Sequence, residues 1–250
     1  MKAILCKNDK ILGEKAAGHI AQFINQAIKE KNCARILVST GMSQFTTFEA
    51  LLALDIDWSK VELFHLDEYI DMPETHPASF IKYLKERFIN KLKINLKQIN
   101  FVDTSIGVEN IISKLTEEIN RDVIDVGVIG IGENGHIAFN DPPADFKCDN
   151  AYKIVKLDDA CRNQQLGEGW FATFDDVPKE AVSMTPKQIL KCRHIISAVP
   201  YKVKAKAIRD TLTAGEITNM IPATILKTHS DWTLYIDNDS ASMIDINKYC

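Results

Sequence analysis

The sequence lacks a long hydrophobic run and an N-terminal targeting pattern. No apolar stretch approaches the ~20 residues that a membrane helix needs. The opening residues, MKAILCKNDK, hold too short an apolar stretch for a signal peptide. We therefore expect a cytoplasmic protein with no membrane partner.

Paired cysteine motifs and a strong charge of either sign are also missing. The six cysteines lie far apart in 250 residues, with no CxxC and no Cys/His spacing of the zinc-finger kind. This predicts reduced thiols and no metal site. The formal net charge of -4 gives no general attraction to nucleic acid, although a local basic pocket could still hold a small anion. The sequence leaves the oligomeric state open, a homo-oligomer included.

What the chain does contain is an alternation of short β-rich runs with longer segments of helical periodicity. Several runs are apolar throughout, as in a sheet that is covered on both faces. This order predicts one α/β domain over residues 1–250, a single-domain doubly wound, mostly parallel sheet with helices on both faces (Rossmann-like). The least regular region, 142–178, is expected to form a lid or an insertion. The predicted strands are 34–40, 61–69, 99–103, 124–132, 194–200 and 232–237.

In such folds ligands bind beyond the carboxyl ends of the strands, so we expect the site in the loops that follow strands. The first is STGMSQFTTFEALLAL, where small and hydroxylated residues from Ser39 to Ser43 lie between a strand and a helix. Free backbone N–H groups and the helix dipole could bind a phosphate there. The spacing is neither a P-loop nor GxGxxG, and a tight turn with an N-cap serine is the alternative.

The second loop, FHLDEYIDMPETHPASF, places Asp67, Glu68 and Tyr69 at the end of an apolar strand. Partial burial at the mouth of the sheet can raise the pKa of a carboxylate into the range that suits a general base. The alternative is an Asp/Glu pair that ends a strand in solvent.

The third loop, GIGENGHIAFND, brings together Asn134, His136 and Asp141 after a predicted buried strand. A histidine between an amide and a carboxylate can hold one tautomer and transfer a proton at neutral pH. No serine or cysteine lies beside it in a nucleophile elbow, which argues against acyl-enzyme chemistry.

Taken together, the three loops resemble those of the glucosamine-6-phosphate deaminase (isomerase) family, whose superfamily includes 6-phosphogluconolactonase. TGMSQFTTFEAL is similar to the family's TGxTPxxxYxxL, LDEYIDMPETHPASF to MDEYxGLPxxHPxSY, and GENGHIAFNDP to GxNGHIAFNEP. The similarity continues through AVSMTPKQILKCRHIISAVPYKVKAKAI to IPATILKTHSDWTLYID. It therefore covers nearly the whole chain in order.

The resemblance implies roles for individual residues in an aldose–ketose isomerisation coupled to loss of ammonia, with no cofactor and a sugar phosphate as the small-molecule partner. Asp67 matches the carboxylate that moves a proton between C2 and C1, and His136 matches the histidine of ring opening. Asn134 and Asp141 fall on the relay positions, where Asp141 replaces the usual Glu. The residues expected around the phosphate are Thr40, Gly41, Met42, Ser43, Lys204 and, as a substitute for the family's arginine, Arg162.

Three alternatives stay open at this point. The resemblance leaves the hexosamine epimer open, so a galactosamine-6-phosphate deaminase or a related isomerase is one alternative. A lactonase of the 6-phosphogluconolactonase type would resemble DER and GPDGHTxSLFP, where this chain has DEY and GENGHIAFNDP. A catalytically silent sugar-phosphate sensor would need neither Asp67 nor His136. The serines that follow NEP in allosterically regulated deaminases are absent from NDPPADF, which argues against activation by an N-acetylated sugar phosphate.

Overall fold

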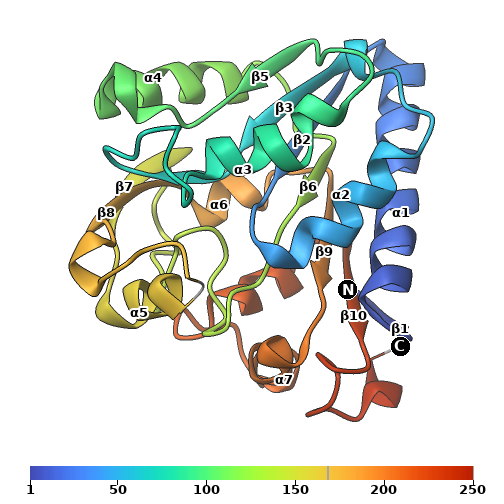
Figure 1. Ribbon diagram of the computed structural model, residues 1–250. Coiled ribbons are helices and arrows are strands. Elements are labelled where there is room, and N and C mark those ends of the chain that lie inside the picture. Colours follow the sequence, from blue (N-terminus) through green and yellow to red (C-terminus); the bar gives the residue numbers. More distant parts are fainter. Residues whose placement is uncertain (168, 250) are drawn as a thin grey trace.

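A computed structural model of the chain describes residues 1–167 and 169–249 and confirms the α/β class. Its centre is a seven-stranded sheet in the order β1-β10-β9-β6-β2-β3-β5, in which all adjacent strands are parallel (Figure 1). The strands of this sheet are β1 (Lys2–Cys6), β2 (Ala34–Val38), β3 (Val61–His65), β5 (Gln98–Asn100), β6 (Val126–Val128), β9 (His194–Val199) and β10 (Trp232–Asp237).

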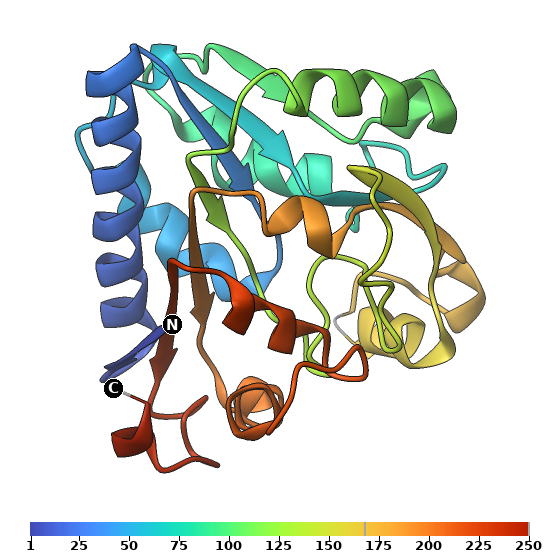
Figure 2. The ribbon, with the colours of Figure 1, turned by 180° about the vertical axis from the view of Figure 1, so that it is seen from behind.

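Helices cover both faces of the large sheet, as Figures 1 and 2 show from opposite sides. Ile36 and Val38 of β2 pack with α1, α2 and α3, whereas Leu37 between them packs in the core that contains α4 and α7. Adjacent residues of a strand point to opposite faces, which explains why these strands are apolar throughout. The helices are α1 (Asp9–Lys31), α2 (Phe45–Leu52), α3 (Phe80–Arg87), α4 (Val108–Ile119), α5 (Asp159–Gly167), α6 (Pro186–Ile189) and α7 (Ala205–Thr213).

Two features were not predicted from the sequence. β1 forms an edge strand that pairs with β10 from Lys2–Thr233 to Cys6–Asp237. A second, antiparallel sheet of order β4-β8-β7 lies beside the large one. Its strands are β4 (Asp67–Tyr69), β7 (Tyr152–Lys156) and β8 (Glu180–Met184).

The small sheet corrects two predictions. The single strand predicted over 61–69 is divided at Leu66 into β3 and β4, which belong to different sheets. The apolar run continues through the division, so the sequence gives no sign of it. Region 142–178 is less irregular than predicted, since it contributes β7 and α5. In the described part of the chain, no helix is both long and apolar enough to span a membrane.

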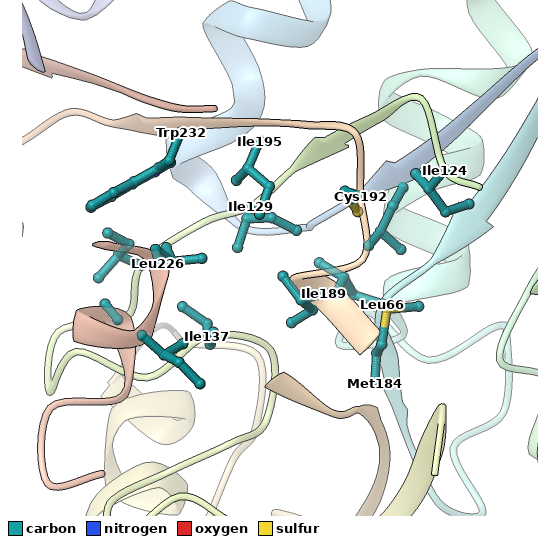
Figure 3. Packing of buried hydrophobic residues seen from close by; sticks show 14 of the residues in the cluster. Leu66, Ile124, Ile129, Ile137, Met184, Ile189, Cys192, Ile195, Leu226 and Trp232 are labelled. Carbon is teal, nitrogen blue, oxygen red and sulfur yellow. The ribbon is translucent and has the colours of Figure 1, made fainter. Parts of the chain in front are cut away.

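A buried core joins the two sheets. Figure 3 shows Trp232 and Ile195 of the large sheet in the same cluster as Leu66 and Met184 at the small one. The Met184 N–H donates to the Leu66 carbonyl at 2.9 Å. The chain is therefore fixed at the point where it leaves β3, immediately before Asp67.

The strand order reverses between β2 and β6. From β2 the chain continues outward to β3 and β5, whereas from β6 it continues to β9 and β10 on the other side. Loops that leave two neighbouring strands in opposite directions open a crevice at their carboxyl ends, where ligands bind in folds of this kind. The first and third loops identified in the sequence follow β2 and β6.

Candidate active site

A cavity lies at this reversal point, beyond the ends of β2 and β6. Its lining also includes residues that the sequence did not single out, among them Phe80, Glu133, Gln165 and Tyr201. Gln165 of α5 is buried and accepts a hydrogen bond from the Tyr69 hydroxyl at 2.6 Å. Seven predicted site residues line the cavity: Thr40, Gly41, Met42, Ser43, Asp67, His136 and Lys204.

One end of the cavity begins with the turn after β2. Gly41 has φ 101° and ψ 163° and precedes a 3-10 turn, Met42–Gln44, that leads into α2. Gly41 is the N-cap residue and the turn has no side-chain cap, so the alternative of a capping serine does not hold. The first N–H groups of a helix have no partner inside the helix and can bind an anion. Ser39 fixes the turn to the neighbouring loop by accepting the Gly130 N–H at 3.0 Å.

A second turn of the same form follows β9. Tyr201 has φ 80° and ψ 145° and precedes a 3-10 turn, Lys202–Lys204, that leads into α7. The Gln44 side chain connects the first turn to the strand that precedes the second, because its Nε2 donates to the Ala198 carbonyl of β9 at 3.2 Å. Two helix N-termini and Lys204 thus line this end of the cavity. Sequence reasoning identified Lys204 but not the turn that carries it.

Another part of the cavity lining contains Asp67, the first residue of β4 in the small sheet. Its side chain is only 6% exposed, which excludes the alternative of a carboxylate in solvent. Burial, with the adjacent Glu68 carboxylate as a second cause, raises the pKa of Asp67 to about 8. A backbone hydrogen bond from Phe139 opposes this shift. Among the described residues, no lysine or arginine forms an ion pair with Asp67.

Glu68 holds the start of α3 against β4. Its carboxylate accepts the N–H of Tyr69 at 3.0 Å, the hydroxyl of Ser79 at 3.0 Å and the N–H of Ile81 at 2.9 Å. Burial nevertheless raises the pKa of Glu68 to about 7. Since its oxygens are already used, Glu68 has a structural role and leaves the cavity to Asp67.

His136 reaches the cavity from the third loop and is held through its Nδ1. That nitrogen lies 2.7 Å from Asn134 Oδ1 and 3.1 Å from Asp141 Oδ1. Both neighbours accept, so Nδ1 carries a proton and Nε2 is left as the proton acceptor. Gly132 is required here because a Cβ on it would lie 2.1 Å from His136 Cε1.

Asp141 reaches His136 despite being one methylene shorter than glutamate. Its Oδ1 also accepts the Asn134 amide at 3.0 Å. Burial alone would raise the pKa of Asp141, but the hydrogen bond and charge of His136, together with Asn134, lower it to about 2. The loop is compact, because Ala138 takes φ 48° and the side chain of Asn140 donates to the Ile137 carbonyl at 2.9 Å.

Arg162 does not line the cavity, contrary to what its expected role in binding phosphate requires. It is buried in α5, where its guanidinium donates to the carbonyls of Phe174 at 2.8 Å and Val177 at 3.0 Å. Its Cζ also lies 3.9 Å from the centre of the Phe174 ring. These contacts hold α5 to the segment that precedes β8.

Known proteins resemble the chain over its full length. Residues 7–235 match the family described as glucosamine-6-phosphate isomerases/6-phosphogluconolactonase. Relatives called glucosamine-6-phosphate deaminase, from Thermoanaerobacter sp. (strain X514) and Halothermothrix orenii, are each 32% identical over 98% of this chain and over 95% and 100% of their own lengths.

Solved structures agree with this relationship. A monomeric glucosamine-6-phosphate deaminase is 30% identical, with a TM-score of 0.86 over 98% of this chain and 100% of its own. The 6-phosphogluconolactonase of Thermotoga maritima shares the fold at a TM-score of 0.76, with 18% identity over 94% of this chain and 98% of its own.

Proposed function

The chain belongs to the family of glucosamine-6-phosphate isomerases and 6-phosphogluconolactonases, and from this premise we propose that it is a glucosamine-6-phosphate deaminase. The reaction converts glucosamine 6-phosphate and water into fructose 6-phosphate and ammonia. Full-length relatives of this name, at about a third identity, support the assignment.

The observation that carries the proposal is that one cavity lining combines an anion-binding part with a part that holds a buried carboxylate. One end has two helix N-termini and Lys204, which suit a phosphate dianion. The other end has Asp67. The negative charges of the nearby Glu68 and Asp141 carboxylates both raise its pKa. An amino sugar phosphate has the opposite pattern, with an ammonium group at C2 and a phosphate at C6. A phosphorylated lactone has no such cation.

The first step is ring opening, which we assign to His136. With Nδ1 held by Asn134 and Asp141, Nε2 takes the proton of the anomeric hydroxyl and returns it to the ring oxygen. The Asp141 carboxylate stabilises the imidazolium that exists between these two transfers. The product of this step is the open-chain aldehyde, from which the C2 proton can be removed.

The second step is proton transfer between carbons, which we assign to Asp67. Because the pKa of Asp67 is raised to about 8, much of this carboxyl group is protonated at neutral pH in the free protein. The substrate's ammonium would favour the ionised form on binding. The carboxylate then takes the C2 proton while a proton passes from the ammonium to the C1 oxygen, which gives a neutral enolamine, and Asp67 returns its proton to C1. Water adds to the resulting C2 imine, and ammonia leaves as the ketose forms.

The phosphate contributes by position. The Lys204 side chain and the N–H groups at 42–43 and 202–203 would bind it, so that its binding energy holds C1 and C2 near Asp67. The sequence does not distinguish the C4 epimers of the substrate, and galactosamine 6-phosphate is therefore the control substrate.

Phosphorylated sugars and reduced thiols are both typical of the cytoplasm, where we expect the enzyme to act.

The test is to incubate the purified protein separately with glucosamine 6-phosphate, galactosamine 6-phosphate and 6-phosphogluconolactone. Ammonia, ketose phosphate and acid release are followed in each. We expect equal amounts of ammonia and fructose 6-phosphate from the first substrate. Acid release from the lactone without ammonia from either amino sugar would contradict the proposal.

A further inference from the structure

Tyr201 has a backbone conformation that few residues other than glycine adopt. Its φ of 80° with ψ of 145° lies in the region where side chains are strained. The equivalent position in the first turn is Gly41, which adopts φ 101° without that strain. Asp237 maintains the strained turn, because its carboxylate accepts the Tyr201 N–H at 3.2 Å and 3.3 Å.

Tyr201 lines the cavity together with Val203 and Lys204 of the same turn. Its hydroxyl donates to Asp9 Oδ2 at 3.3 Å, so the ring extends from the second turn to the first residue of α1. Burial raises the pKa of this phenol, and the neighbouring Asp9 adds to the shift, so the hydroxyl stays a donor. The hydrogen bond thus fixes the ring between the turn that carries Lys204 and the start of α1.

A glycine would form this turn without strain, as Gly41 does in the first turn. A tyrosine at this position costs conformational strain, so we infer that its side chain has a role other than forming the turn. We propose that Tyr201 determines specificity at the phosphate end: its ring closes the subsite around a terminal phosphomonoester and excludes phosphate esters that carry a second substituent. The inference rests on the proposed function, which puts the substrate's phosphate at this end.

Two consequences follow from a subsite that the ring closes. A phosphodiester would have to displace the ring and break the hydrogen bond to Asp9 before its phosphate could approach Lys204. The ring would also keep water away from the phosphate and from Lys204, which strengthens their attraction. Removing the ring should thus weaken the monoester and admit the diester.

The experiment compares Tyr201→Gly, Tyr201→Phe and the wild type. The control is Asn32→Gly, which places glycine at another positive φ, 59°, at the end of α1 and outside the cavity lining. Calorimetry gives the Kd of inorganic phosphate, of glucosamine 6-phosphate and of its methyl phosphodiester. Thermal unfolding gives Tm for each variant.

For Tyr201→Gly we expect Kd for the monoester to rise about tenfold and the preference for monoester over diester to fall by at least about tenfold. Its Tm should not fall below that of the wild type, because the strain is relieved. Tyr201→Phe keeps the ring and should keep most of the preference. Asn32→Gly should change neither.

An unchanged preference in Tyr201→Gly would overturn the inference. A fall in Tm together with an equal rise in Kd for all three ligands would also overturn it, because that result indicates a purely structural role. Failure of the proposed function would appear differently, as binding of sugar phosphate without release of ammonia by the wild type.

Discussion

The two ends of the cavity use opposite physical means. At the reaction end, burial shifts the pKa of Asp67 upward, while hydrogen bonds shift that of Asp141 downward. At the phosphate end, half-buried Lys204 supplies positive charge and the backbone N–H groups supply oriented hydrogen-bond donors. Two neighbouring aspartates thus have pKa values of about 8 and about 2. The first end is thus adapted to proton transfer and the second to binding.

The largest effect should come from Asp67→Asn at the reaction end. The amide keeps the shape of the carboxylate but cannot accept the C2 proton, so kcat should fall about 1000-fold or more, with little change in KM. Steady-state kinetics of ammonia release measures both. A variant with near-normal kcat would remove Asp67 from the mechanism.

His136→Gln and Asp141→Asn should reduce kcat by about 10- to 100-fold, since each weakens the relay but leaves Asp67 in place. Both variants should keep C1–C2 proton exchange on an open-chain analogue, because that substrate needs no ring opening. Deuterium exchange into the analogue is measured beside ammonia release from the cyclic sugar. Equal losses in the two assays would show that the relay acts at enolisation.

Lys204→Ala tests the phosphate end. We expect KM to rise about tenfold or more while kcat falls less, because a charged hydrogen bond to the phosphate is lost in both ground state and transition state. Lys204→Arg serves as the charge-preserving control. A loss confined to kcat would mean that the two ends of the cavity are not separate in function.

The raised pKa of Asp67 also predicts a pH-dependent difference in stability. A carboxyl with pKa 3.8 in the unfolded chain and about 8 in the folded protein contributes stability that is complete below pH 4 and is lost as pH rises through 8. Asp67→Asn removes this dependence. Its Tm should therefore exceed that of the wild type at pH 8.5 and approach it at pH 5. A constant Tm difference across this range would contradict the assignment of burial as the cause.

The smallest kinetic effect should come from Arg162→Lys. Lysine cannot reproduce the paired hydrogen bonds to Phe174 and Val177, so Tm should fall, whereas KM should stay within about twofold of the wild type. Thermal unfolding and kinetics separate the two outcomes. A tenfold rise in KM with an unchanged Tm would restore Arg162 to the phosphate end.

The sequence predicted the residues that directly follow each strand better than it predicted the elements that pack around them. Apolar strands followed by glycine, hydroxyl or carboxylate residues are local signals, and they led to Thr40, Asp67 and His136, which all line one cavity. The second sheet could not be predicted, because its pairing joins Asp67 to Ser183 across the sequence. The functional assignment of these residues stays a prediction.

Tyr201 and Arg162 are two residues whose conformation and contacts could not be predicted from the sequence. The strain at Tyr201 is a property of φ, which no side-chain pattern reports. Arg162 was chosen by its place in the sequence near a missing arginine, and only the structure reveals that backbone carbonyls already use its guanidinium. Local composition indicates which residues can do chemistry, whereas contacts between distant segments decide which of them are available.

The pairing of β1 with β10 has a consequence for how the chain is made. Residues 2–6 are synthesised long before 232–237, with which they pair in the described part of the chain, so the pairs from Lys2–Thr233 to Cys6–Asp237 form only once β10 has been made. Contacts of such long sequence separation slow folding. Until then the edges of β1 and β9 stay open, and an open parallel edge invites pairing with another chain. We expect nascent chains that stop before Trp232 to depend on chaperones, and the completed sheet to release them.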